Sequence, residues 1–433
     1  MTLRYIAEIR DPIHGYIKIT QEEREIIDSI FVQRLRRIHQ LAGAYLVYPG
    51  GVHSRFEHVI GTMHVAGLVA QSIGDKAGLR DDDIQELRIA ALLHDVGHGP
   101  FSHLFEEILT EKTDLTHEDL SQRIVSESDI GDILRRNGRK PSNISKLCVG
   151  KSKGPAFMNQ VVAGGLSADM MDYLLRDTYF TGVEYGKVDI QRVIDSLDVS
   201  TDHHLILERA ALYAFEALLI ARYEMFKAVY FHRTVRAAEL MLAHSMALAD
   251  RELHLTDLSR LGRMLRLTDE VVLQQLVDLP PRTPELKTAR KLASNYIQRK
   301  LVKCVFEKVM QRKDRTIQGI FSNKRFRDEL ASDIAQSARV KPSDIYIDVP
   351  NTPSVPYTSE REMFNSITLF STDVRDSSRK LETVPISELP LVGSITGFMD
   401  ILRIYTYPEN RSKVTTAVEA IFGKEDFMSR ISV

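Results

Sequence analysis

Residues 92–103, LLHDVGHGPFSH, constrain this chain more than any other stretch, because they place metal-ligating side chain types where a helical pattern ends. The helix predicted to begin with the acidic run at 81–83 ends at Gly97. His94 and Asp95 then lie at its C-terminal end, where glycines allow the backbone to bend so that both side chains reach one ion. An imidazole and a carboxylate suit a divalent ion such as Mn, Fe, Zn or Mg. Two ligands are too few, so the fold must bring others from elsewhere in the chain.

Two further candidate ligands lie in separate helical patterns. His58 follows Arg55 in SRFEH at the start of one pattern, and Asp169 lies in LSADMMDYLLRD (166–177) within another. Two imidazoles and two carboxylates would leave coordination positions open for water, which is typical of a hydrolytic site and not of a closed structural one. A divalent metal there would lower the pKa of a bound water towards ~7.

Helical patterning dominates from about residue 21 to about residue 310 and predicts a mainly α fold. The segment 22–41 has apolar residues at helical spacing, with a possible break at Asp28–Ser29. Residues 57–78 predict a helix that ends at a glycine. The segment 208–250 contains neither Gly nor Pro and predicts one long helix or two abutting ones.

The β-forming residues concentrate at the two ends of the chain. Residues 3–20 predict a short β-hairpin with its turn at 11–16. After about residue 340, strands are expected in 344–357, 365–371 and 401–407, followed by a closing helix over 413–423. The expected organisation is a catalytic core over 1–250, a helical extension over 251–340 and a small α/β C-terminal subdomain over 341–433.

Composition limits the class of protein. Hydrophobic residues make up 43% and charged residues 27% of the chain, as in ordinary soluble proteins. The net charge of −2 gives no global basic field, so nucleic-acid binding is not indicated, although a local basic cleft remains compatible with it. The cysteines Cys148 and Cys304 form neither a disulfide framework nor a thiolate metal site, which favours the cytoplasm. The charged N-terminus is unlike a signal peptide, and the apolar stretch 210–223 is too short to span a membrane.

These residues carry a family resemblance. His58, the His94–Asp95 pair and Asp169 resemble the H…HD…D signature of the HD-domain metal phosphohydrolases. A closer resemblance is to the deoxynucleoside triphosphate triphosphohydrolases, a group that includes mammalian enzymes with a SAM domain and an HD domain. It is carried by DPIHGYIKI, QRLRRIHQLAGAYLVYPGGVHSRFEH, LLHDVGHGPFSH, LTHED and MDYLLRDTYFTGVEYG. The resemblance is strong over roughly residues 5–240 and thinner beyond, and no SAM domain is expected ahead of the core.

The resemblance implies a metal-dependent reaction that releases deoxynucleoside and inorganic triphosphate from a deoxynucleoside triphosphate. The implied metal ligands are His58, His94, Asp95 and Asp169, for Mg, Mn, Fe, Zn or Ni. Arg55 matches the arginine on the α-phosphate, and His117 matches a general acid for the leaving 5′-oxygen, with Glu106 as its carboxylate partner. Further substrate contacts are implied for residues along the triphosphate and around the sugar: Gln40, His98, His103, Tyr173, Asp177, Arg222 and Tyr230.

Regulation and assembly are also implied by the resemblance. Asp28, Gln33 and Arg36 match residues that read a guanine nucleotide, GTP or dGTP, at an activator site between subunits, so a homodimer or homotetramer is expected. The sequence departs from relatives at two places. Met170 stands where relatives often carry a Lys or Arg that reaches the triphosphate, and Ala7 and Glu8 occupy the neighbourhood of a basic contact to the activator.

Alternative interpretations remain at this stage. An exposed His117 near a helix start is compatible with a solvated or capping residue, and Tyr230 with an ordinary core face. Asp28, Gln33 and Arg36 are compatible with a solvated helix face. The same metal site also suits a nucleotidase or phosphodiesterase acting on a monophosphate or cyclic nucleotide. A nucleotide-sensing or single-stranded nucleic-acid-binding module with little turnover is the alternative from another functional class.

Overall fold

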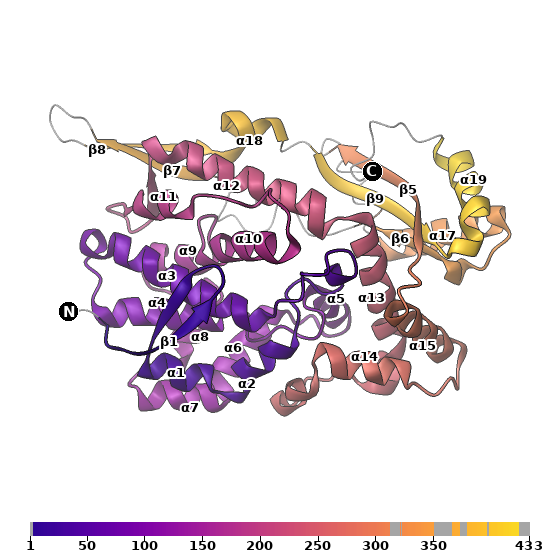
Figure 1. Ribbon diagram of the computed structural model, residues 1–433, viewed down its shortest axis with the longest axis horizontal. Coiled ribbons are helices and arrows are strands. Elements are labelled where there is room, and N and C mark those ends of the chain that lie inside the picture. Colours follow the sequence, from indigo (N-terminus) through magenta and orange to yellow (C-terminus); the bar gives the residue numbers. More distant parts are fainter. Residues whose placement is uncertain are drawn as a thin grey trace.

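The computed structural model describes residues 3–311, 321, 323–349, 366–372, 379–395 and 398–423. The described residues are mainly helical, with an antiparallel hairpin at the N-terminus and small sheets towards the C-terminus (Figure 1). This confirms the predicted fold class.

The N-terminal segment forms the predicted hairpin. Strands β1 (Tyr5–Asp11) and β2 (Gly15–Thr20) pair in antiparallel register up to Asp11 opposite Gly15. Helices α1 (Gln21–Ile27) and α2 (Ile30–Arg34) follow, so the expected break at Asp28–Ser29 is confirmed. The expected helix 22–41 nevertheless ends early. After the 3-10 turn Leu35–Arg37 the chain is extended at Ile38 and His39, where His39 pairs with Ser54 in an isolated antiparallel bridge. The Gln40 amide donates to the His53 carbonyl and the Arg55 amide to the Ile38 carbonyl.

Three helices frame the centre of the molecule. Helix α3 (Arg55–Ala77) packs against both α4 (Asp81–Leu93) and α10 (Ala168–Thr181). Shorter helices surround them: α5 (His103–Thr113), α6 (His117–Glu127), α7 (Asp129–Arg136), α8 (Pro141–Leu147), α9 (Ala156–Ala163) and α11 (Ile190–Asp195). The predicted helix 57–78 is therefore confirmed, and it begins at Arg55.

The helix that leads to the His94–Asp95 pair ends at Leu93, four residues before the expected end at Gly97. Neither Gly97 nor Gly99 has a positive φ, so glycine is not needed there for a left-handed backbone conformation. It is needed because neighbouring atoms pack too closely for a side chain. A Cβ on Gly97 would lie 2.2 Å from the carbonyl oxygen of His117, so only glycine lets α6 approach the loop. The residues of this stretch with positive φ are Phe101 and Ser102.

The long segment without Gly or Pro forms two abutting helices, one of the two predicted outcomes. Helix α12 (Leu212–Met225) leads into a π-helical turn, Phe226–Tyr230, and α13 (Arg233–Leu253) continues beyond it. Such π turns are rare and occur frequently at functional sites. This one presents Tyr230 at the junction.

The remaining helices are α14 (Asp269–Val277), α15 (Pro284–Ile297), α17 (Lys324–Ala338), α18 (Pro390–Ile395) and α19 (Arg411–Phe422). A four-stranded sheet has the order β3 (Leu197–Val199), β4 (Leu205–Glu208), β7 (Ser366–Thr372) and β8 (Arg379–Pro385). A three-stranded sheet has the order β5 (Lys303–Gln311), β9 (Phe398–Thr406) and β6 (Ile345–Asp348).

Strand β5 corrects the expectation of helix up to about residue 310. Its β-forming residues pair with β9, a partner remote in sequence that local periodicity does not reveal. The expected strands at 365–371 and 401–407 and the closing helix are confirmed as β7, β9 and α19. The expected strand 344–357 is present as β6 over Ile345–Asp348, and its residues 350–357 lie outside the described ranges. The predicted domain boundaries stay a prediction.

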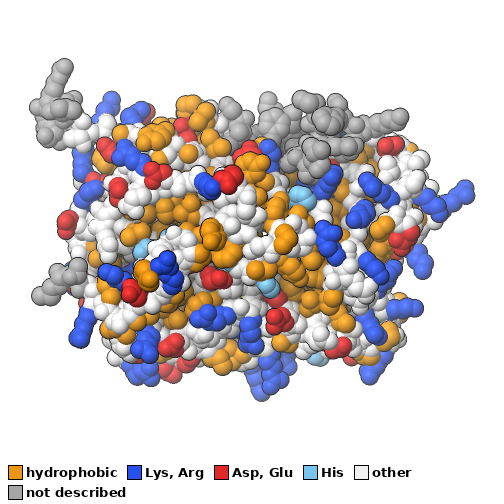
Figure 2. All heavy atoms as spheres, in the orientation of Figure 1, with side chains coloured by type: hydrophobic (Ala, Val, Ile, Leu, Met, Phe, Trp, Pro, Cys, Tyr) orange, Lys and Arg blue, Asp and Glu red, His pale blue; other side chains and the backbone are white. Residues whose placement is uncertain are grey.

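Three hydrophobic clusters organise the interior of the described chain. The largest extends from Ile17 to Tyr407, and a smaller one lies between β5, β6, β9, α17 and α19, around Ile334, Leu402 and Val414. The third consists of Phe226, Phe231 and Ile401. Of the helices that the structure describes, none is both long and apolar enough to cross a membrane. On the face shown in Figure 2, basic and acidic side chains are interspersed, in agreement with the small net charge.

Candidate functional site

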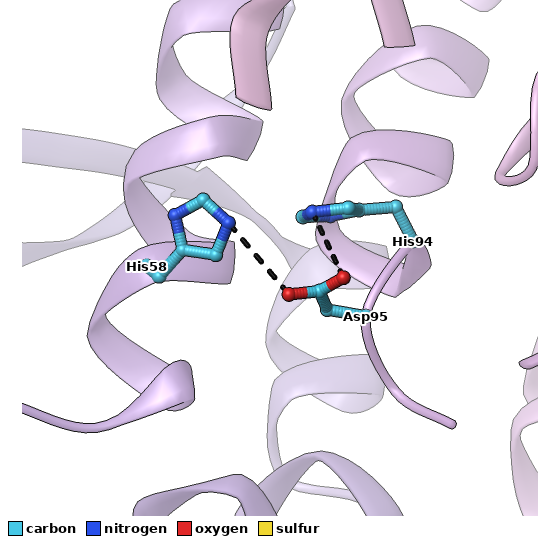
Figure 3. Close-up of side chains that lie close together, drawn as sticks. All are labelled: His58, His94 and Asp95. Atoms are coloured by element: carbon cyan, nitrogen blue, oxygen red, sulfur yellow. Dashed lines mark ion pairs between the residues drawn. The ribbon is translucent and has the colours of Figure 1, made fainter. Parts of the chain in front are cut away.

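The structure brings together the four side chains that the sequence singled out as metal ligands. His58 comes from the first turn of α3, and His94 and Asp95 come from the turn after α4 (Figure 3). His94 Nε2 lies 3.3 Å from Asp95 Oδ1, and His58 Nε2 lies 3.7 Å from Asp95 Oδ2. Asp169, from the first turn of α10, places Oδ1 3.1 Å from His58 Nε2 and 3.6 Å from His94 Nε2.

Each imidazole is oriented through its other nitrogen. His94 Nδ1 lies 2.7 Å from the carbonyl oxygen of Ala91, which makes Nδ1 the protonated nitrogen. His58 Nδ1 lies 2.9 Å from Asp172 Oδ2, and Arg176 donates two hydrogen bonds to the same carboxylate. His14, from the hairpin turn, lies 2.7 Å from Asp172 Oδ1. Metal-ligating histidines commonly have such an outer partner, which fixes the ring and its tautomer.

Charged neighbours shift the pKa values of the histidines and carboxylates of this site. Burial opposes protonation of His58, but Asp169 and Asp172 outweigh it and raise the pKa of His58 to about 10. Burial likewise opposes the charge on His94, and Asp95 and Asp169 raise its pKa. Although burial opposes ionisation of Asp95, the neighbouring His94 and Arg55 hold its pKa well below the usual range. A potential that favours protons at both Nε2 atoms favours a divalent cation there as well.

The donor set fits a divalent metal. Nε2 of His58 and Nε2 of His94 are buried without a hydrogen bond acceptor of suitable geometry, and both face the carboxylates of Asp95 and Asp169. Two imidazole nitrogens and carboxylate oxygens are ligands that Mn, Fe, Zn and Ni accept, and Mg accepts the carboxylates. The geometry does not choose among these ions.

Arg55 lies beside the cluster on the first turn of α3. Its guanidinium pairs with Asp95 Oδ2, and its Nε donates to Ser102 Oγ at 2.7 Å. The side chain is almost completely buried, at 3% exposed. The four side chains His58, His94, Asp95 and Asp169 are called the metal-type cluster below. A cation fixed this close to the metal-type cluster can neutralise the oxygens of a phosphate bound there.

His117 and Glu106 form the pair that the sequence predicted. His117 Nδ1 lies 2.5 Å from Glu106 Oε1, so Nε2 is left as the working nitrogen of the ring. Burial opposes ionisation of Glu106, but His103 and His117 lower its pKa and keep it a carboxylate. The ring of His98 stacks on that of His117, with centroids 4.0 Å apart. Asp95, His98 and His117 also place possible ligand atoms within 4.8 Å of one another.

A second group of polar side chains lies further along α10. Tyr230, from the π turn, donates to Asp177 Oδ2 at 2.6 Å, and His53 Nε2 lies 2.8 Å from Asp177 Oδ1. The ring centroids of Tyr173 and Tyr230 are 6.5 Å apart. The structure thus brings together three of the residues predicted around the sugar, on α10 and on the junction of α12 with α13.

Gln40 and Arg222 border this region. The amide nitrogen of Gln40 donates to the His53 carbonyl, and its side chain Oε1 is buried without a hydrogen bond partner. Arg222 donates to Met170 Sδ at 3.5 Å, and its guanidinium lies 5.3 Å from the ring centroid of Phe226. Met170 is therefore buried beneath an arginine.

The three expected activator residues share one short segment near α2. Arg36 Nε donates to Gln33 Oε1 at 2.9 Å, and Gln33 Nε2 donates to the Ile27 carbonyl at 2.9 Å. The exposed Asp28 lies 3.8 Å from Arg24. The Arg36 guanidinium lies 3.5 Å from the ring centroid of Phe56, the residue next to Arg55.

Several contributing residues were not assigned a role from the sequence: His14, His53, Ser102, Asp172 and Asp269. Asp172 had a detectable signal, because it follows Asp169 by three residues on the same helix. His14, His53 and Asp269 contact residues remote in sequence. Ser102 lies within 92–103, but its contact with Arg55 forms only in the folded chain, so spacing did not reveal it.

Comparison with known proteins agrees with this geometry. Residues 55–154 match the family described as HD domain, and residues 188–429 match the family described as HD associated region. A protein of Aquifex aeolicus, described as hypothetical, has a similar crystal structure, with a TM-score of 0.75 and 27% identity over 95% of this chain and all of that one.

Named relatives include the uncharacterized protein YwfO of Bacillus subtilis, 33% identical over 57% of this chain and 56% of that protein. The deoxynucleoside triphosphate triphosphohydrolase SAMHD1 homolog of Dictyostelium discoideum is 32% identical over 69% of this chain and 60% of that protein. The chain therefore spans less than two thirds of the length of these relatives. SAMHD1 of Bos taurus is 27% identical over 79% of this chain. Because the HD associated region alone covers more than half of its length, this chain is a member of the HD-domain family and carries both an HD domain and the HD associated region.

Proposed function

We propose that this chain hydrolyses deoxynucleoside triphosphates to deoxynucleoside and inorganic triphosphate, with His58, His94, Asp95 and Asp169 as metal ligands. The observation that carries the proposal is that three polar side chains line one face of α10. Asp169, Tyr173 and Asp177 follow at intervals of four residues and so share one face of this helix, over roughly 12 Å. At one end of this face, Asp169 lies in the metal-type cluster, and at the other end Asp177 contacts Tyr230 and His53. A nucleoside triphosphate is elongated and needs such a site, with its phosphates at one end and its nucleoside at the other.

Each side chain has a role in this reaction. A bound divalent metal supplies a water of lowered pKa and Lewis acidity towards the phosphate. Arg55 neutralises charge that develops on the α-phosphate oxygens. His117, oriented by Glu106, donates a proton to the leaving 5′-oxygen, and His98, His103 and Arg222 contact the triphosphate. A sugar 3′-hydroxyl donates to Asp177, while Tyr173, Tyr230 and Gln40 leave little room for a ribose 2′-hydroxyl.

The finer parts of the proposal concern regulation. Asp28, Gln33 and Arg36 bind GTP or dGTP between subunits of a homodimer or homotetramer, and the contact of Arg36 with Phe56 leads from that segment to Arg55. The cytoplasm is the proposed location. The relatives named as deoxynucleoside triphosphate triphosphohydrolases support this substrate class.

A product assay tests the function directly. The protein is incubated with each deoxynucleoside triphosphate and Mg, Mn or Fe, with and without GTP, and the products are separated by ion-exchange chromatography. Deoxynucleoside and intact triphosphate are the expected products. His94→Ala is expected to abolish them, a greater loss than the roughly 10- to 100-fold cost of removing an outer partner of a ligand.

The matched control is His204→Ala, which removes an exposed histidine in the turn between β3 and β4. It should leave turnover unchanged. Release of pyrophosphate or inorganic monophosphate would contradict cleavage of the bond between the α-phosphorus and the 5′-oxygen. Turnover of nucleoside monophosphates or cyclic nucleotides alone would favour the nucleotidase or phosphodiesterase alternative, and nucleotide binding without any product would favour a sensor.

A further inference from the structure

The loop that carries His98 and His103 has a backbone that its own residues do not favour. Phe101 has φ 56° and Ser102 has φ 58° with ψ −117°. The combination at Ser102 is the one that glycine normally supplies in tight turns. Two consecutive non-glycine residues with positive φ persist only where surrounding contacts hold them.

Those contacts come from α14, which lies outside the matched HD domain. Asp269, the first residue of α14, accepts the Phe101 amide on Oδ1 at 2.7 Å. Its Oδ2 accepts the amide of His39 at 2.9 Å and lies 2.8 Å from His39 Nδ1. The Asp269 side chain is 4% exposed, so water competes little for these bonds.

The bonds continue from Asp269 to the centre of the candidate site. The His39 carbonyl accepts the Ser102 hydroxyl at 3.0 Å, and Ser102 Oγ accepts Arg55 Nε at 2.7 Å. Arg55 then pairs with Asp95. The carboxylate of Asp269 thus holds two segments of backbone, the loop at Phe101 and the chain at His39. Ser102 follows Phe101 and bonds the His39 carbonyl, so it is held between these two segments.

Arg34 braces the same loop from its other end. Its fully buried guanidinium donates to the carbonyl oxygens of Val96 and His98 and, on the opposite side, to those of Met264 and Leu267. The segment 264–269 therefore contacts both ends of the loop, directly through Asp269 and through Arg34.

We propose that Asp269 is a positioning residue for the hydrolytic reaction. It holds residues 97–103 in the strained form that aims Arg55, His98 and His103 at the phosphates. The HD associated region thereby contributes to the active site without touching the substrate. The kinetic part of this inference rests on the proposed function.

Asp269→Asn tests the inference, because asparagine has the same shape as aspartate but only one acceptor oxygen instead of two. The matched control is Asp250→Asn on α13, since Asp250 also accepts a backbone amide and a side chain donor, but both come from Thr256 and neither comes from the loop. The two readouts are steady-state kinetics with a deoxynucleoside triphosphate and peptide-level hydrogen exchange over residues 96–104.

For Asp269→Asn we expect kcat to fall by about 10- to 100-fold, KM to change by less than about threefold, and bound metal per chain to stay equal to wild type. Exchange over 96–104 should become at least about tenfold faster, because the single acceptor oxygen of asparagine cannot serve both the Phe101 amide and the His39 amide, and the contacts that hold the loop weaken. Asp250→Asn should change neither. An unchanged kcat, or loop exchange equal to wild type, would overturn the proposal.

A second variant keeps the test decisive if Asp269→Asn does not fold. Arg34→Lys retains the charge but cannot bond all four carbonyl oxygens, and it should give the same faster exchange over 96–104 with metal retained. Equal hydrogen exchange over 96–104 in wild type and Arg34→Lys would then contradict the inference that these contacts hold the loop. If wild-type protein releases no triphosphate, the proposed function fails, while the exchange comparison still decides whether Asp269 holds the loop.

Discussion

At the scale of single residues, the titratable groups behind the metal-type cluster are set by burial and by their neighbours. His64 on α3 lies beside His14, with ring centroids 5.2 Å apart. Burial, together with the charges of His14 and Arg88, lowers the pKa of His64 from 6.5 to about 4. The folded protein therefore keeps this imidazole neutral at pH values where the unfolded chain protonates it.

This difference predicts a pH dependence of stability. Between pH 6.5 and 4 the unfolded state binds one more proton than the folded state at His64, so stability falls as the pH falls. At about pH 5 the loss reaches up to about 2 kcal/mol. His64→Gln should remove this contribution, so the difference in unfolding free energy between wild type and variant should shift by that amount between pH 7 and 5.

Urea unfolding at a series of pH values measures the shift. His204→Gln is the control, since the His204 side chain is half exposed. Parallel stability curves for wild type and His64→Gln would show that His64 titrates alike in both states.

At the scale of elements, α3 shows how one helix combines a ligand with the packing that orients it. Gly61 lies one turn after His58, and a Cβ built there would lie 1.8 Å from Asp172 Oδ1 and 2.3 Å from an Arg176 nitrogen. The Asp172–Arg176 pair occupies the space that a side chain would need. Gly74, near the end of the same helix, has no atom within 4 Å of its Cβ position.

Replacing each glycine by alanine should therefore have opposite effects. Gly74→Ala should stabilise the protein by about 0.5–1 kcal/mol through helix propensity. Gly61→Ala should destabilise it by about 1–3 kcal/mol through overpacking, and it should weaken metal binding because Asp172 can no longer orient His58. Thermal unfolding and metal titration measure both effects. Equal behaviour of the two variants would be inconsistent with this packing.

The same elements show what local sequence could and could not predict. Helices α3 and α10, the break after Asp28 and the four clustered side chains followed from periodicity, breakers and motif resemblance. The end of α4 did not, because Gly97 is required by the approach of α6 and not by a helix stop. Strand β5 and the contact of Asp269 with Phe101 depend on partners remote in sequence, and no local pattern encodes such partners.

At the scale of the whole molecule, the two matched regions share one interior. The largest hydrophobic cluster includes Met63 from α3, Leu292 from α15 and Tyr405 from β9, so it crosses all three expected domains. Strand β9 also joins this cluster to the one around Ile334, since Leu402 and Ile404 belong to the smaller one and Tyr405 to the largest. The hydroxyl of Tyr405 donates to the Arg233 carbonyl on α13 and fastens this strand to the long helix.

A shared interior predicts cooperative unfolding. Chains of this length often unfold in several steps when their domains have separate cores. Here the loss of either matched region would expose apolar surface of the other, so differential scanning calorimetry should give one main transition. A metal that binds only the folded state should move this whole transition upward. Two well-separated transitions, with only one of them sensitive to Mn or Mg, would show instead that the HD associated region folds independently and that its contact with the catalytic loop is dispensable for the fold.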